Sequence, residues 1–188
     1  MSMRVSFELE DSDLKHFQLI MKEARKAAAN ISAEDIVAAA RTLLQRVEAV
    51  KVPDFIKERL QRLEIMIQML DDHEWRLPAK DASRVLNALA YFSEPEDLIP
   101  DHIPGLGFLD DAIMIELVTR ELRPEIDAYH DFCEYRRQMA PRAGVKAKTT
   151  DLTREDWLKE RRSQLQSRMR RRRKNAADSG KKSPLRLL

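Results

Sequence analysis

The sequence predicts an all-α fold, a helical bundle of about six helices with a short N-terminal strand and a basic C-terminal helix and tail. Three observations lead to this class. Apolar residues recur at steps of three and four through most of the chain. Prolines and polar cap residues separate these runs. A chain of 188 residues with 43% hydrophobic residues can also bury one core.

Four helices are expected before residue 93. Ser12 or Asp13 is predicted to cap the first and Ser32 the second, because their side-chain oxygens can accept hydrogen bonds from first-turn N–H groups. Pro53 and Pro78 separate the third and fourth from what precedes them. The four predicted apolar faces are Leu14, Phe17, Met21, Ala24 and Ala28; Ile36, Ala40, Leu43, Val47 and Val50; Ile56, Leu60, Leu63, Ile67 and Leu70; and Ala82, Val85, Leu86, Leu89 and Phe92.

The later helices have stronger apolar signals. Residues 109–122 are so densely apolar that they predict the most buried helix, whereas residues 57–62 (KERLQR) of the third helix are expected to face water. Pro124 suits a first helical turn, so a sixth helix is expected to start there. Its inward residues would be Ile126, Tyr129 and Cys133.

Charge is distributed unevenly along the chain. Residues 1–145 hold 19 Lys and Arg against 27 Asp and Glu, a net charge of −8, while residues 146–188 hold 15 against 5, a net charge of +10. An acidic body is therefore joined to a basic tail, and the tail is where a polyanion would bind. The predicted organisation is a strand and helical pair at 1–52, a helical core at 53–140 packed with it as one domain, a linker at 141–152, and a basic helix and disordered tail at 153–188.

The basic tail predicts a binding helix. Thr153 and Asp156 have the spacing of a capping box at its start, and disorder is expected after about Asn175. RNA, including ribosomal RNA, or DNA is the predicted partner of residues 154–174, because guanidinium groups pair with phosphates in a bidentate manner. Three alternatives are a solvated charged face, an anionic membrane surface, and docking on the acidic body that would block the other partners. The predicted polyanion-binding residues are Arg161, Arg162, Arg168, Arg170, Arg171, Arg172, Arg173 and Lys174.

Several classes of protein receive no support from the sequence. A single cysteine, Cys133, provides no disulfide framework, and neither a signal-peptide run nor 18 consecutive apolar residues occurs. We therefore expect a reduced cytoplasmic protein without a transmembrane span. A glycine-rich phosphate loop, a nucleophile elbow and zinc-ligand spacing are also missing, so an enzyme is the weakest hypothesis, and we predict no catalytic residue, cofactor or metal.

One stretch carries a family resemblance. Residues 91–111, YFSEPEDLIPDHIPGLGFLDD, resemble the signature of the YkvA-like family, a small bacterial helical domain of unknown function. Glu94 and Glu96 depart from the family's usual residues and make the turn more acidic. The resemblance implies a helical fold and supplies no activity. The motif positions are Pro95, Asp97, Pro100, Asp101, Pro104, Gly107, Asp110 and Asp111.

The acids of this motif have two interpretations. They can cap helices and form salt bridges, which is the expected role, or they can converge as a Mg²⁺, Ca²⁺ or acid/base site. The candidate cluster comprises Asp97, Asp101, His102, Asp110 and Asp111, and its spacing matches no EF-hand. Asp127 and His130 form a further Asp-x-x-His pair, which we expect to be solvated.

The N-terminus supports an alternative function. Val5, Phe7 and Leu9 alternate with polar residues as in a half-exposed strand. With the two helices after it, residues 4–47 look like a ribbon-helix-helix unit, a dimeric DNA-binding fold whose strand residues would face the bases. Acidic residues near the strand disfavour phosphate contact, so a strand that caps the bundle or pairs in a homodimer is expected instead. The base-facing residues would be Arg4, Ser6 and Glu8.

Overall fold

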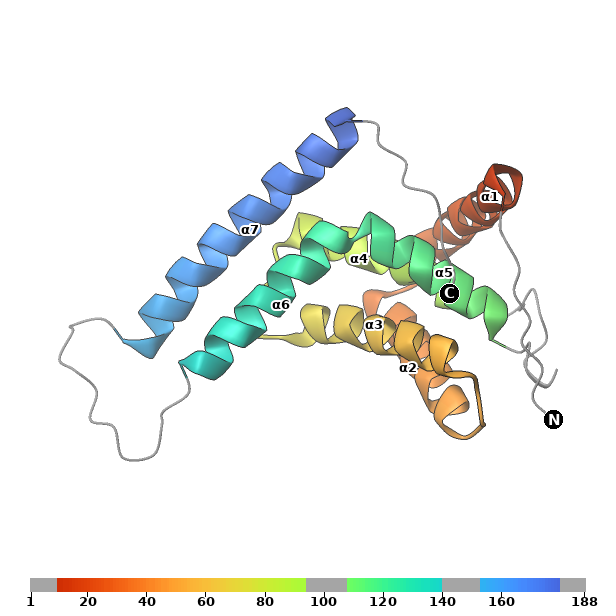
Figure 1. Ribbon diagram of the computed structural model, residues 1–188, viewed down its shortest axis with the longest axis horizontal. Coiled ribbons are helices and arrows are strands. Elements are labelled where there is room, and N and C mark those ends of the chain that lie inside the picture. Colours follow the sequence, from red (N-terminus) through yellow and green to blue (C-terminus); the bar gives the residue numbers. More distant parts are fainter. Residues whose placement is uncertain (1–9, 94–107, 140–152, 180–188) are drawn as a thin grey trace.

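The structure is a computed structural model that describes residues 10–93, 108–139 and 153–179, and every regular element in these ranges is a helix (Figure 1). The predicted all-α class is therefore confirmed for this part of the chain. The predicted strand at residues 5–9 lies outside the described residues. In chain order the elements are α1 (Asp11–Ala27), η1 (Ala28–Asn30), α2 (Ala33–Glu48), α3 (Asp54–Asp71), α4 (Ala79–Leu89), η2 (Ala90–Ser93), α5 (Leu109–Glu121), α6 (Arg123–Gln138) and α7 (Arg154–Ser179).

Polar side chains define the starts of the first two helices. α2 begins after Ser32, whose Oγ accepts a hydrogen bond from the Asp35 N–H at 3.1 Å, as predicted. α1 begins at Asp11, slightly earlier than predicted. Asp13, one of the two predicted caps, instead accepts a hydrogen bond from the Glu10 N–H at 2.9 Å, so that Glu10 takes the cap position.

One cluster of buried apolar side chains receives residues from all seven α-helices. α5 is the most thoroughly buried, as predicted, since eight of its thirteen residues are buried. Two predictions about individual side chains were wrong. Val50 is 49% exposed because α2 ends at Glu48 and leaves it in the connection to α3. Arg59, expected to face water, is 5% exposed, because its guanidinium packs over the Phe55 ring and donates to the Phe55 carbonyl at 3.2 Å.

The connection between α3 and α4 is held by local hydrogen bonds. Asp72 Oδ1 accepts from the N–H groups of Glu74 and Trp75 at 2.9 and 3.0 Å. Trp75 is fully buried, and its ring lies 5.1 Å from that of Phe132 in α6. Arg76 adopts the left-handed region with φ 47°, a conformation that costs a non-glycine residue about 1 kcal/mol or more. The surrounding contacts must offset this cost.

The last helix runs back along α6 in the opposite direction (Figure 1). Its start is the predicted capping box: the Thr153 N–H donates to Asp156 Oδ2 at 2.9 Å, and the Asp156 N–H donates to Thr153 Oγ1 at 3.2 Å. The helix continues to Ser179, beyond the predicted onset of disorder near Asn175. Two alanines follow Asn175, and alanine is the best helix former, which explains the extension.

Candidate functional site

The basic helix α7 is docked on the rest of the protein. Leu158, Leu165 and Met169 are 3%, 1% and 0% exposed, and they belong to the common apolar core. They lie at helical spacings of seven and four, so they form one stripe of α7 that faces α6. Among the alternatives that the sequence left open for the basic helix, the structure therefore shows docking on the body of the same chain.

Carboxylates of the body surround this stripe, and we call them the acidic face: Glu74 of the α3–α4 connection, Asp81 of α4, and Glu125, Asp127 and Asp131 of α6. Every one of them pairs with an arginine of α7. The charge asymmetry seen in the sequence thus becomes a row of ion pairs between two surfaces. The pairs are Arg154–Glu74 at 2.6 Å, Arg168–Asp131, Arg170–Asp81 at 3.4 Å, Arg172–Asp127 at 3.3 Å, and Arg173 to both Asp81 and Glu125 at 2.8 Å.

The most enclosed of these pairs centres on Arg173. Asp81 and Glu125 occupy the first turns of α4 and α6, where a negative charge suits the helix dipole, and their side chains are 3% and 0% exposed. Arg84 gives Glu125 a second cationic partner at 3.2 Å. Because an ionised carboxylate is costly to bury without a counter-charge, these two acids need the arginines that surround them.

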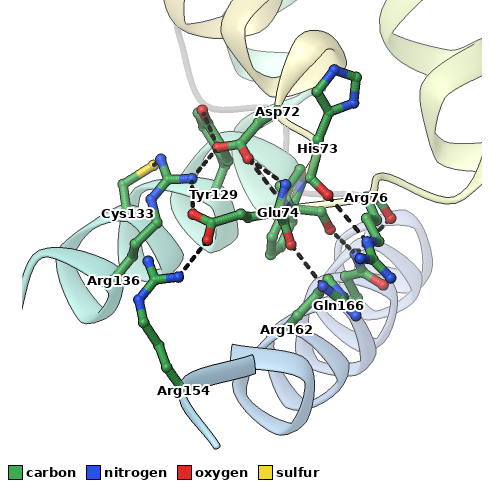
Figure 2. Close-up of polar contacts among 11 residues, drawn as sticks. Asp72, His73, Glu74, Arg76, Tyr129, Cys133, Arg136, Arg154, Arg162 and Gln166 are labelled. Atoms are coloured by element: carbon green, nitrogen blue, oxygen red, sulfur yellow. Dashed lines mark hydrogen bonds and ion pairs between the residues drawn. The ribbon is translucent and has the colours of Figure 1, made fainter. Parts of the chain in front are cut away.

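Directional hydrogen bonds tie α7 to the α3–α4 connection. Arg162 donates to the Glu74 carbonyl at 2.7 Å, and Gln166 Nε2 donates to the carbonyls of Trp75 and Arg76 at 3.0 and 3.3 Å (Figure 2). Three consecutive carbonyls, including that of the left-handed Arg76, therefore have partners on α7. Bonds of this kind fix the register of the helix, which charge attraction alone does not do.

A second set of contacts places the same connection on α6. Arg136 pairs with Asp72 at 2.7 Å and with Glu74 at 3.1 Å, and the Tyr129 hydroxyl donates to Asp72 Oδ2 at 3.0 Å (Figure 2). Partial burial acts to raise the pKa of the Asp72 carboxyl, but hydrogen bonds from the Trp75 N–H, Tyr129 and Arg136 outweigh it and lower the pKa. The hydrogen bond from the Arg154 guanidinium is the main cause of the lowered pKa of Glu74.

The eight predicted polyanion-binding residues divide into two groups. Six contact the body: Arg162, Arg168, Arg170, Arg172 and Arg173 through the bonds above, and Arg161 by stacking its guanidinium 5.4 Å from the centre of the Tyr135 ring. Arg171 and Lys174 are exposed and form no ion pair with any residue that the structure describes. Asp127 and His130 were expected to be solvated: His130 is exposed, and Asp127 is half-exposed but also pairs with Arg172.

Most of the family motif falls outside the described ranges. This applies to Pro95, Asp97, Pro100, Asp101, Pro104 and Gly107, and also to His102 of the candidate metal cluster. Asp110 and Asp111 lie in the first turn of α5, as predicted, and are 2% and 5% exposed. The Tyr91 hydroxyl lies 3.5 Å from Asp110 Oδ2. Within the described ranges, no three His, Cys, Asp or Glu residues gather closely enough to hold a metal ion.

Sequence reasoning missed the body's half of the docking site. Asp81, Glu125 and Gln166 had no predicted role. Asp131 and Glu74 had no distinguishing pattern either. The only available signal was the opposite net charge of the two parts of the chain, which predicts attraction without naming the partners.

Comparison with known proteins identifies the family of this chain. Residues 84–117, which reach from α4 into α5, match a family described as a protein of unknown function, DUF1232. The chain is also 35% identical over 79 residues to a protein of Bacillus subtilis (strain 168) called "Uncharacterized membrane protein YkvA", an alignment that covers 39% of this chain and 73% of that protein. The chain belongs to the YkvA-like family. No solved structure gives a significant match.

Among the residues that the structure describes, no helix combines the length and the apolar character needed to cross a bilayer. The segment that matches the family description includes Arg84, but it contains neither α7 nor any residue of the acidic face.

Proposed function

We propose that this protein is a non-catalytic cytosolic interaction protein that binds RNA or another polyanion through α7. The observation that carries the proposal is that one helix carries ten Lys and Arg residues, five of which make ion pairs with carboxylates in the folded chain. Guanidinium groups placed to pair with carboxylates can pair with phosphates through the same donor geometry. α7 is thus chemically suited to a polyanionic partner.

Arg171 and Lys174 are the cations of α7 that a polyanion can reach first. Both are exposed, and neither forms an ion pair within the described part of the chain. Arg170 and Arg172 flank them with side chains that are 45% and 54% exposed and with longer ion pairs, at 3.4 and 3.3 Å. This end of α7 therefore offers a compact group of cations without any movement of the helix.

The test measures RNA affinity of the full chain at several salt concentrations. The double variant Arg171→Gln, Lys174→Gln removes two charges from α7, and Lys15→Gln, Lys22→Gln removes two from the exposed side of α1 as a matched control. If both cations contact single-stranded RNA, the slope of log affinity against log salt should flatten by roughly 1.4 in the first variant only. Equal slopes for the two variants would contradict the proposal.

A second candidate function is binding to an anionic membrane surface. The observation that favours it is the name of the relative, which describes that protein as a membrane protein. A basic helix with an apolar stripe can lie in the headgroup region, although Leu158, Leu165 and Met169 would first have to leave the core. Co-sedimentation with vesicles of anionic and of zwitterionic lipid distinguishes this function from RNA binding.

A further inference from the structure

Docking turns the more basic side of α7 inward. The arginines that pair with the acidic face lie beside the buried stripe, and Arg173 is only 22% exposed between Asp81 and Glu125. The opposite side of the helix is exposed and mostly uncharged over its middle turns. The exposed residues on that side are Glu160, Ser163, Gln164, Ser167, Arg171 and Lys174.

An arginine that is held by the acidic face cannot give the same donors to a phosphate. The approaching phosphate would also meet the carboxylates of the acidic face, and like charges at such short range repel. Arg168 and Arg172 have half-exposed partners in Asp131 and Asp127, so these pairs can be exchanged most easily. A polyanion that uses the whole row of arginines must therefore replace the acidic face.

We infer that docking of α7 on the acidic face and full engagement of α7 by a polyanion exclude each other, so the body is a built-in competitor that autoinhibits binding. This inference rests on the function proposed above. Release of α7 would leave the order of the other described helices unchanged, because α7 follows them in the chain and its covalent link to α6 runs through residues 140–152. The apparent dissociation constant is then the intrinsic one divided by the released fraction.

The first experiment weakens docking without changing charge. Leu165→Ala removes a side chain that is 1% exposed, and Gln164→Ala alters the neighbouring exposed position as the control. Truncating a buried leucine should raise the released fraction roughly 30-fold or more until the helix is fully released. Affinity for labelled oligouridylate should rise at least about tenfold with Leu165→Ala, and by less than about twofold with Gln164→Ala.

A second pair of variants serves if Leu165→Ala does not fold. Asp127→Asn with Asp131→Asn removes two partners of α7, while Glu48→Gln with Glu64→Gln makes the same charge change at exposed positions on α2 and α3. Loss of two half-exposed ion pairs should tighten RNA binding by roughly 2- to 30-fold beyond the control pair. Equal effects would mean that only overall charge matters.

The second experiment observes the helix directly. Nitroxide labels at Ser83→Cys in α4 and Ser163→Cys in α7, both exposed positions, are placed in a Cys133→Ser background. Pulsed electron paramagnetic resonance should give one narrow distance distribution for the free protein. Saturating oligouridylate should broaden it and shift it to longer distances. Heparin should do the same if the effect depends only on polyanionic charge.

The outcomes separate this inference from the proposed function. RNA binding with an unchanged label distance, and equal affinities for Leu165→Ala and Gln164→Ala, would overturn autoinhibition while leaving polyanion binding intact. RNA binding by the docking-weakened variants but not by the natural chain would support autoinhibition strongly. If none of these proteins bound RNA or heparin, the proposed function and the inference would fail together. Binding to anionic vesicles alone would identify a membrane surface as the partner of α7.

Discussion

Replacing Arg173 by methionine tests whether α7 is an integral part of the folded body. The substitution replaces arginine by an unbranched side chain about as long as its aliphatic stem, and it removes the charge shared by Asp81 and Glu125, which are 3% and 0% exposed. Removing one partner of a buried ion pair costs ~3–5 kcal/mol. The lower end applies here, because Arg170 and Arg84 still contact the two carboxylates at 3.4 and 3.2 Å. We expect a loss of about 3 kcal/mol.

Thermal and urea unfolding give the first measurement. For a chain of this size the loss corresponds to a melting temperature lowered by about 6–12 °C. Arg171→Met is the matched control, since this exposed residue has no ion pair within the described chain, and its effect should stay within about 0.5 kcal/mol. Adding Asp81→Asn to Arg173→Met should recover part of the loss, because an amide needs no counter-charge.

If α7 undocks in Arg173→Met, the loss of unfolding free energy is limited, because water then solvates the carboxylates of Asp81 and Glu125. Hydrogen exchange of the α7 amides detects this event even where global unfolding does not. Faster exchange confined to residues 154–179 in Arg173→Met would identify undocking. Indistinguishable unfolding and exchange for Arg173→Met and Arg171→Met would refute the reasoning that the buried acids depend on α7.

Three further predictions concern other contacts. The pKa values of Asp72 and Glu74 are lowered in the folded state, so these carboxylates stabilise the fold at pH values above the ordinary carboxyl pKa. This contribution should be lost as the pH falls below about 4.5, and the melting temperature should fall with it. Glu116→Gln removes a largely buried carboxylate that pairs with the buried Arg59 at 3.6 Å and with the partly exposed Arg62 and Arg120 at 2.7 and 3.2 Å. It should cost about 3 kcal/mol in urea unfolding, against no more than about 0.5 kcal/mol for the exposed Glu64→Gln. Ser32→Ala removes a helix cap and should cost about 1 kcal/mol by the same assay.

Local sequence determined the helices of this protein. Ser32 and Thr153 cap helices where their side chains predict it, because a cap bond joins residues only three positions apart. The dense apolar run of residues 109–122 likewise predicted the most buried helix, since a helix that is apolar on nearly every side is buried on nearly every side. Val50 was misplaced because the apolar pattern does not show that α2 ends at Glu48, and Arg59 because its partner Glu116, 3.6 Å away, lies in the distant helix α5.

The pairing of α7 with the body was decided only by the tertiary structure. Arg173 meets Asp81 across 92 positions of sequence and Glu125 across 48, and no local pattern relates residues so far apart. Composition offered docking of the basic helix on the acidic body only as one alternative, because Coulomb attraction depends on charge alone and does not select the partner. Which carboxylate meets which arginine, and whether the arginines face inward or outward, depends on the packing of Leu165 and Met169 into the core. The sequence thus determined that the chain carries a basic amphipathic helix, and the fold determined that its own acidic face occupies that helix.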